Sequence, residues 1–237
     1  MDKGFGQFCP VAVACEIFAA RWTPMILREL LAGSHHFNEI HRGLPAMSRA
    51  LLARRLRELE AAGIVRREVA SSGRGARYGL TEAGREFRSV LEPLGVWGQR
   101  WAQRAARHNL DPEFLMWNMR RRIARDALPP RRVVVQLNFR GVPPERRGYR
   151  EFWLVLTSAD VDLCVTDPGF EVDVYVDARI DAMVHVWLGD TTWRAAVGDG
   201  SVRITGTRDL VKAFPSWLLL SHYAGVPRVR SAVTAAR

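Results

Sequence analysis

The first hundred residues follow a regular pattern of apolar positions. Apolar side chains recur at helical spacing over residues 11–20, 22–31, 37–42 and 48–62. Residues 64–70 and 78–81 have strand character, and the Gly- and Ser-rich segment 71–77 between them predicts a β-hairpin. A long helical stretch is expected over residues 81–108, with a kink or a new start at Pro93.

The helix predicted over residues 48–62 has two different faces. Leu52, Leu56 and Leu59 fall on one stripe that should face the core, and Ser48 is a suitable N-cap. The residues opposite this stripe or beside it are small or basic: Arg49, Ala50, Ala53, Arg54, Arg55 and Arg57. The element order therefore predicts a winged helix-turn-helix whose third long helix enters the major groove.

Roles on this helix can be assigned by position. We expect Arg49, Ala50, Ala53 and Arg54, near its start, to meet base edges, and the capping Ser48 to belong to the same DNA-binding surface. Arg55 and Arg57 should lie nearer phosphate, and Arg74 and Arg77 on the hairpin should reach the minor groove or the backbone. The alternative is an ordinary solvated helix face, which the neighbouring elements disfavour.

The second half has a different pattern. A polar stretch at residues 106–112 marks a domain boundary. The elements expected after it are helices over residues 113–126, 178–188 and 210–223 and strands over residues 133–139, 152–157, 161–166, 172–176 and 201–205. This order predicts an α+β fold with an antiparallel sheet and helices against one face.

Charge supports a nucleic-acid partner. The chain of 237 residues has a formal net charge of +10, which favours nucleic acid or an anionic membrane surface. Residues 48–77 alone hold eight Arg and three Glu. A membrane span needs about 18 consecutive apolar residues, and the sequence contains no such run. We therefore expect no membrane insertion and a cytoplasmic location.

Other chemistry is not indicated. Three Cys without motif spacing (Cys9, Cys15 and Cys164) disfavour a disulfide framework or a zinc site. His35, His36 and His41 are close in sequence, but adjacent His side chains rarely aim at one ion, so an exposed loop is favoured over a metal site. No nucleophile or metalloprotease motif is present, so the expectation is a protein without enzymatic activity, metal or cofactor.

The first half resembles the HxlR family of bacterial winged helix-turn-helix regulators. The matching segments are CP at the start, RWTPMIL, HFNEI, LPAMS, LLARRLRELEAAGIV and YGLTEAGREF. The resemblance implies a homodimer, formed by the first and last helices, on a palindromic operator in double-stranded DNA. In the family a Cys near the first helix can act as a thiol sensor, and Cys9 stands at that position, whereas Cys15 should be a buried packing residue.

The second half is similar to the sterol carrier protein type 2-like domain. The similarity lies in a strand, a helix ending in W-x-G-D, a second helix and a strand running into G-x-x-D-L. It implies a hydrophobic cavity for a small apolar ligand. The residues that could line it are Trp153, Met183, Trp187, Trp193, Phe214 and Trp217, and the alternative is that these side chains are ordinary core.

These observations predict a ligand-responsive transcription regulator. A winged helix and dimerisation domain would occupy residues 1–108, and a ligand-binding domain residues 111–230. The alternative is a lipid-binding or carrier protein whose winged helix mediates protein contacts. An enzyme acting on a bound acyl compound is a third, less favoured interpretation.

Overall fold

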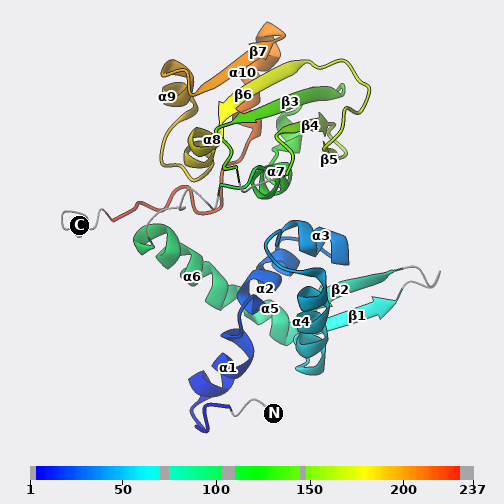
Figure 1. The fold of residues 1–237 in the computed structure, drawn as a ribbon, viewed down its shortest axis with the longest axis vertical. Coiled ribbons are helices and arrows are strands. Elements are labelled where there is room, and N and C mark those ends of the chain that lie inside the picture. Colours follow the sequence, from blue (N-terminus) through cyan, green and yellow to red (C-terminus); the bar gives the residue numbers. More distant parts are fainter. Residues whose placement is uncertain (1–3, 70–74, 103–109, 145–147, 230–237) are drawn as a thin grey trace. The chain divides into compact units, whose positions relative to one another are not determined.

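The chain folds into two compact units, Met1–Gly95 and Val96–Arg237. The computed structural model describes residues 4–69, 75–102, 110–144 and 148–229 (Figure 1). Each unit has its own hydrophobic core. The boundary falls inside one helix, α6 (Arg88–Trp101).

The first unit is a winged helix-turn-helix. Its helices before the wing are α1 (Pro10–Phe18), α2 (Thr23–Leu31), α3 (Phe37–Arg42) and α4 (Arg49–Ala61). The antiparallel strands β1 (Val65–Val69) and β2 (Ala76–Leu80) form the wing (Figure 1). The helices and the hairpin predicted between residues 11 and 81 are thereby confirmed.

The prediction of one helical stretch over residues 81–108 was wrong in detail. The chain forms a short helix α5 (Glu82–Glu86), breaks at Phe87 and continues as α6. Pro93 lies inside α6 and does not start it. Because proline has no backbone N–H, α6 continues through Pro93 without the hydrogen bond to the carbonyl of Ser89, four residues earlier. Residues 103–109 of the expected helix lie outside the described residues.

Helix α4 is held by the stripe that its sequence predicts. Leu52, Leu56 and Leu59 are buried in the core of the first unit. The Ser48 hydroxyl accepts a hydrogen bond from Leu51 N at 3.3 Å, and Gly63 ends the segment with φ 71°. Burying each leucine contributes about 1.5–3 kcal/mol, which is enough to fix which face of α4 turns outward.

Helix α1 differs from the others because it contains no buried residue. It is followed by Trp22, whose positive φ of 79° produces the break before α2. In the described part of the chain, no single helix is long and apolar enough to span a membrane; α1 and α2 reach that length and hydropathy only as a pair bent by 79°.

The second unit contains a five-stranded mixed sheet. Its strands are β3 (Val133–Arg140), β4 (Glu151–Leu156), β5 (Val161–Cys164), β6 (Val174–Arg179) and β7 (Val202–Gly206), in the order β5-β4-β3-β6-β7. The predicted antiparallel sheet was wrong at one pairing, because β3 and β6 are parallel. After β5 the chain crosses to the far side of β3, and this crossover sets the direction of β6.

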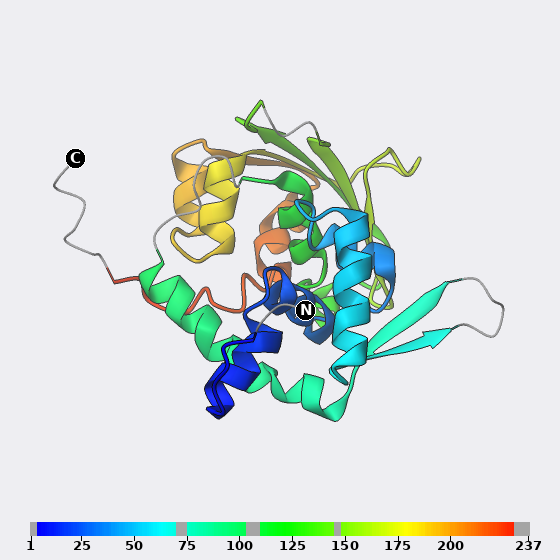
Figure 2. The same ribbon diagram turned by 60° about the horizontal axis from the view of Figure 1, so that its bottom comes forward.

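Helices of this unit share their core with one face of the sheet. Helices α7 (Pro112–Arg120), α8 (Ile180–Trp187), α9 (Trp193–Gly198) and α10 (Arg208–Trp217) all contribute buried side chains to it (Figure 2). Alternate strand residues such as Val135, Leu137 and Phe139 meet them. The α+β class is confirmed.

Two predicted helices of this unit are shorter than expected. The helix after residue 112 ends at Arg120 and is followed by a short 3-10 turn, Arg125–Ala127, and the last helix ends at Trp217. The segments that follow them pair with each other: Ala124 N donates to Trp217 O and Leu219 N to Arg122 O, both at 2.8 Å. Long-range pairing replaces helical hydrogen bonds there. The end of strand β6 also runs past residue 176, and α8 begins at Ile180.

Candidate functional site

The outer face of α4 is open to solvent along its whole length. Ser48, Arg49, Ala50, Arg54 and Arg57 are exposed. Ala53 and Arg55 are half-buried at the edges of this face. The stripe of leucines and the basic face thus lie on opposite sides of one helix, as a helix that enters a groove requires.

Two arginines of α4 share one acceptor but differ in exposure. Arg55 Nη1 lies 2.6 Å from Glu58 Oε2, and its side chain is 22% exposed. Arg54 Nε lies 3.6 Å from Glu58 Oε1, and its side chain is 58% exposed. The buried Arg55 Nε has no hydrogen-bond partner among the described residues. Arg54 is therefore the freer of the two to reach outward.

Arg49 is attached to the preceding helix. Its guanidinium donates a hydrogen bond to Asn38 Oδ1 and lies over the Phe37 ring, 5.2 Å from the centroid. These contacts join the first turn of α4 to the first turn of α3. The sequence pattern predicted Arg49 as a free base contact and did not reveal this bracing.

A buried carboxylate positions the turn between α3 and α4. The Glu29 side chain is fully buried, and Arg28 Nη2 donates both to Glu29 Oε1 at 2.8 Å and to Gly43 O at 3.0 Å. A Cβ at Gly43 would come within 2.0 Å of the Glu29 carboxylate, so a larger residue here would displace that carboxylate from Arg28 and Ser34. Ser34 Oγ donates to Glu29 Oε2 at 3.2 Å. The sequence feature that points to this buried carboxylate is a glutamate within an otherwise apolar helix.

The histidines near α3 make structural hydrogen bonds. His35 Nδ1 lies 3.2 Å from Tyr78 O and His41 Nε2 lies 2.9 Å from Met47 O. Glu39 Oε2 accepts from the backbone N–H of His35 and His36. Partial burial acts to raise the pKa of Glu39, but these bonds outweigh it and lower that pKa. Among residues 4–69, 75–102, 110–144 and 148–229, no three His, Cys, Asp or Glu side chains gather as a metal site would need.

The wing presents Arg77 to solvent. Arg77 is the register partner of Glu68 across the hairpin, and Glu68 also pairs with Arg66 at 2.9 Å. The predicted contact Arg74 lies outside the described residues. Of the two predicted wing residues, the structure therefore places Arg77 alone.

The three cysteines lie in different environments. Cys9 is exposed and is the N-cap residue of α1, and the backbone N–H groups of Ala12 and Val11 lower the pKa of its thiol. Cys15 is half-buried, less than expected for a packing residue. Burial raises the pKa of Cys164, and the neighbouring Asp162 adds to the effect.

Helices α1 and α6 expose apolar side chains. Val11 and Val13 are 70% and 50% exposed on α1. On α6, Leu94, Trp97 and Trp101 are 44%, 58% and 47% exposed. An exposed Trp pair on one helix face is a feature that partner surfaces commonly cover.

Five of the six candidate ligand residues belong to one core, and Trp153 does not. Phe214, Trp217 and Met183 are buried in the core of the second unit. Trp193 meets Phe214 edge-on at 5.6 Å, and Phe214 meets Trp217 at 6.1 Å. Trp187 is half-buried against the same core.

Trp153 lies on the other face of the sheet. Its neighbours on β4, Phe152 and Leu154, both enter the core of the second unit. Side chains alternate along a strand, so Trp153 points away from that core. It cannot line one cavity with Phe214 and Trp217.

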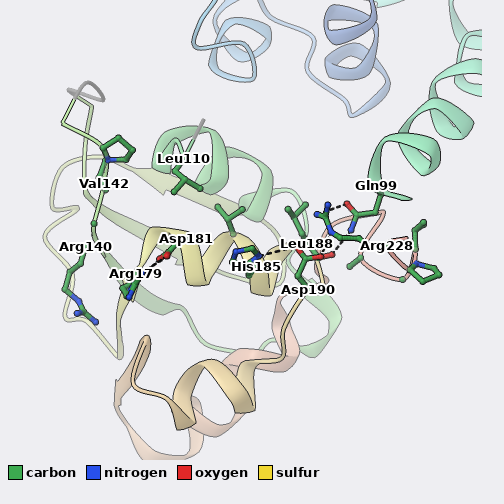
Figure 3. A pocket seen from close by; sticks show the side chains of 18 of the residues that line it. Gln99, Leu110, Arg140, Val142, Arg179, Asp181, His185, Leu188, Asp190 and Arg228 are labelled. Atoms are coloured by element: carbon green, nitrogen blue, oxygen red, sulfur yellow. Dashed lines mark hydrogen bonds and ion pairs between the residues drawn. The ribbon is translucent and has the colours of Figure 1, made fainter. Parts of the chain in front are cut away.

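A pocket of about 1390 Å³ opens elsewhere in the second unit, and none of the six candidates lines it. Its walls come from residues 140–144 and 224–228, from Leu110 and Gln99, and from Arg179, Asp181, Val184, His185, Leu188, Gly189 and Asp190 (Figure 3). These segments are far apart in sequence, which explains why spacing did not reveal them.

One end of this pocket holds a chain of polar contacts. Arg228 Nε lies 2.5 Å from Asp190 Oδ1, and His185 Nδ1 lies 3.2 Å from Asp190 Oδ2. Arg228 Nη2 also donates to Gln99 Oε1 at 3.4 Å, and Gln99 Nε2 donates to Leu188 O at 3.2 Å. The other end holds Arg140 and Arg179 (Figure 3), and apolar residues such as Leu110 and Val184 also line the pocket.

Known proteins match the first part of the chain. The family model described as "HxlR-like helix-turn-helix" matches residues 17–106. The uncharacterized HTH-type transcriptional regulator YvaP of Bacillus subtilis is 34% identical over 111 residues, which are 46% of this chain and 95% of that protein. The HTH-type transcriptional regulator YodB of B. subtilis is 32% identical over 97 residues, or 40% of this chain and 87% of that protein.

A solved structure is also similar to part of this chain. The reduced form of YodB from B. subtilis is 33% identical and has a TM-score of 0.35, with 39% of this chain and 93% of that chain covered. The matched region contains α2, α3, α4 and the wing, which are the elements that build the exposed basic face. With almost the whole of YvaP covered at this identity, the chain belongs to the HxlR-like helix-turn-helix family of transcriptional regulators.

Proposed function

We propose that this protein regulates transcription by binding double-stranded DNA through α4 and the wing. The observation that carries the proposal is the outer face of α4, where Arg54 and Arg57 are exposed opposite the buried leucines. Arg54 is the residue best placed to read a base. Arg57 and the wing residue Arg77 contact phosphate, and we propose the same role for Arg74.

The DNA-bound form is a homodimer on a palindromic operator. The apolar side chains exposed on α1 and α6 support this proposal, because they need a partner surface. In a dimer the two α4 helices would lie about 34 Å apart, one turn of DNA. Cys9, exposed and with a lowered thiol pKa, is the residue through which oxidation would act on α1.

The second unit senses a small hydrophobic ligand. We place the DNA-binding and dimerisation domain at residues 1–108 and the ligand-binding domain, similar to sterol carrier protein type 2, at residues 111–230. Helices packed on one face of a sheet, with a pocket partly lined by apolar side chains, support this assignment. Ligand control requires different affinities for two states, and a coupling of about 1–3 kcal/mol is sufficient.

Salt dependence tests the DNA-binding proposal. The affinity of the full chain for duplex DNA is measured by fluorescence anisotropy at several salt concentrations. Each phosphate contact should add about −0.9 to the slope of log K against log salt, so several contacts give a steep fall. A carrier protein whose winged helix binds another protein would give weak binding and a slope close to zero, and that result would contradict the proposal.

A matched pair of variants locates the contact. Arg57→Ala should weaken binding to all duplexes and lower the steepness of the slope by roughly one unit. Arg194→Ala removes the same charge from an exposed position on α9 in the second unit. Equal effects of the two substitutions would show that net charge, and not the face of α4, governs binding.

A further inference from the structure

We propose that the pocket of the second unit binds an organic anion, with its charged group against Arg140 and Arg179 and its apolar part against Val142, Val184 and Leu188. This inference rests on the proposed function, in which the second unit binds a small ligand. The proposed site differs from the aromatic core, and the proposed ligand carries a negative charge. Figure 3 shows the two arginines together at one end of the pocket.

Strand pairing places the two arginines side by side. Arg140 and Arg179 are register partners at the ends of the parallel strands β3 and β6. Like charges at directly paired positions of a sheet disfavour each other. Their side chains are 50% and 54% exposed, and both residues line the pocket. An anion between them would remove the repulsion.

Existing acceptors leave part of this cationic end unsatisfied. Arg179 donates to Asp181 through both Nε and Nη2. Arg140 donates to Asp177 through Nε alone, and within the described residues its two terminal nitrogens have no acceptor. A guanidinium carries five N–H donors in a fork that matches carboxylate, sulfonate or phosphate oxygens. Arg140 therefore has donors for a bound anion.

The opposite end of the pocket is less suited to an anion. There Arg228 is already engaged by the Asp190 carboxylate and by the Gln99 amide oxygen. His185 Nδ1 also contacts the Asp190 carboxylate. At the Arg140 end one lining carboxylate, Asp181, faces two lining arginines, whereas Asp190 faces the single arginine Arg228, so the charged group of a ligand belongs at the Arg140 end.

The pocket surface between the two ends determines the size and the polarity of the rest of the ligand. Leu110, Val142, Val184 and Leu188 supply apolar surface between the charged ends. The pocket volume of about 1390 Å³ exceeds the 300–1,000 Å³ range of ordinary small-molecule sites. The ligand class is thus an amphipathic organic anion of substantial size, and an inorganic ion would leave most of the pocket unfilled.

Two fluorescent probes with the same ring skeleton test this. 8-Anilinonaphthalene-1-sulfonate carries a sulfonate, and N-phenyl-1-naphthylamine lacks it. Each is titrated into the full-length protein and into Arg140→Met, Arg179→Met and the control Arg194→Met. Thermal unfolding of each variant verifies folding, and the two pocket variants act as independent tests.

The anionic probe should bind roughly tenfold more tightly than the neutral probe. Each of Arg140→Met and Arg179→Met should weaken the anionic probe about fivefold to tenfold and change the neutral probe less than twofold. Arg194→Met should change neither. Equal affinity of the two probes, or the same affinity for the anionic probe in Arg140→Met, Arg179→Met and Arg194→Met, would overturn the proposed site.

DNA affinity measured with and without the anionic probe separates this inference from the proposed function. Arginine-dependent binding with no effect on DNA affinity would keep the site and contradict ligand sensing. If the probe changes the DNA affinity of Arg140→Met and Arg179→Met as it does that of the unchanged protein, the proposal of ligand sensing stands and the proposed arginine site is overturned.

Discussion

Arg28 and Glu29, adjacent on α2, form an ion pair of 2.8 Å in which the glutamate side chain is completely shielded from solvent. The same Arg28 nitrogen bonds to Gly43 O, in the turn that leads to α4. A buried carboxylate is costly unless cations and hydrogen bonds satisfy it. This pair therefore holds the turn that precedes α4.

Replacing Arg28 tests that dependence. Arg28→Met removes a cation from a buried carboxylate and should lower the stability of the first unit by roughly 3 kcal/mol. Hydrogen–deuterium exchange of peptides from α2 and α4 measures the loss. Arg67→Met, at an exposed position on β1, is the control and should change exchange little. Similar exchange in both variants would contradict the role given to the pair.

Two glycines give opposite predictions for the same substitution. A Cβ on Gly84 would lie 2.2 Å from Ile64 O, a backbone atom that cannot move easily, whereas a Cβ on Gly98 would meet nothing within 4 Å. Gly84→Ala should cost about 2 kcal/mol or more in unfolding free energy. Gly98→Ala in α6 should be neutral or stabilise by up to about 1 kcal/mol. Denaturant unfolding followed by circular dichroism distinguishes them, and a destabilising Gly98→Ala with a neutral Gly84→Ala would contradict the packing at α5.

Cysteine reactivity should follow the pKa shifts. The backbone N–H groups of Ala12 and Val11 lower the pKa of Cys9, while burial raises that of Cys164. More Cys9 is then thiolate at neutral pH, and the thiolate is the form that reacts. Iodoacetamide labelling followed by mass spectrometry should show Cys9 alkylated first and Cys164 last. The reverse order would mean that access and not ionisation determines the rate.

The carboxyl of Asp173 should make the second unit acid-sensitive. Partial burial acts to raise its pKa, but hydrogen bonds from Arg131 Nη2 at 2.8 Å and Val134 N at 2.9 Å outweigh burial and lower it. A group with a lowered folded-state pKa stabilises the fold above the unfolded pKa of about 3.9, and this stabilisation is lost as pH falls through the folded pKa.

Asp173→Asn should therefore make the unfolding free energy fall less steeply as the pH is lowered. Urea unfolding of the second unit is measured by tryptophan fluorescence at several pH values below about 5. The unchanged protein should lose more stability on acidification than the variant does. Parallel curves would show that Asp173 has the same pKa in both states.

Local periodicity predicted the elements that depend on neighbours in sequence. The spacing of Leu52, Leu56 and Leu59 was sufficient to identify α4 and its outer face, because a helix repeats every 3.6 residues. The parallel pairing of β3 with β6 was not predictable, since it depends on a crossover that leaves no periodic signal. The predicted meander followed sequence order, and the true strand order does not.

The candidate sites show the same limit. Trp153 was grouped with Trp217 by residue type alone, although the alternation of Phe152, Trp153 and Leu154 indicated two different faces. The pocket residues Arg140, Arg179 and Arg228 come from three segments that only the tertiary fold brings together. A signal did exist for two of them, since Arg140 and Arg179 each end a strand of alternating apolar residues.

The most direct test compares two neighbouring arginines of α4 on DNA. Operator duplexes are selected from a random pool with the full-length protein, and the ratio of operator to random-DNA affinity is measured for Arg54→Ala and Arg55→Ala. Arg54 reaches outward, so Arg54→Ala should lower the ratio by roughly tenfold, the effect of losing a base contact. Arg55 is turned along the helix toward Glu58, so Arg55→Ala should keep the ratio within about twofold. An unchanged ratio in Arg54→Ala, with operator binding intact, would contradict the claim that the exposed face of α4 reads DNA.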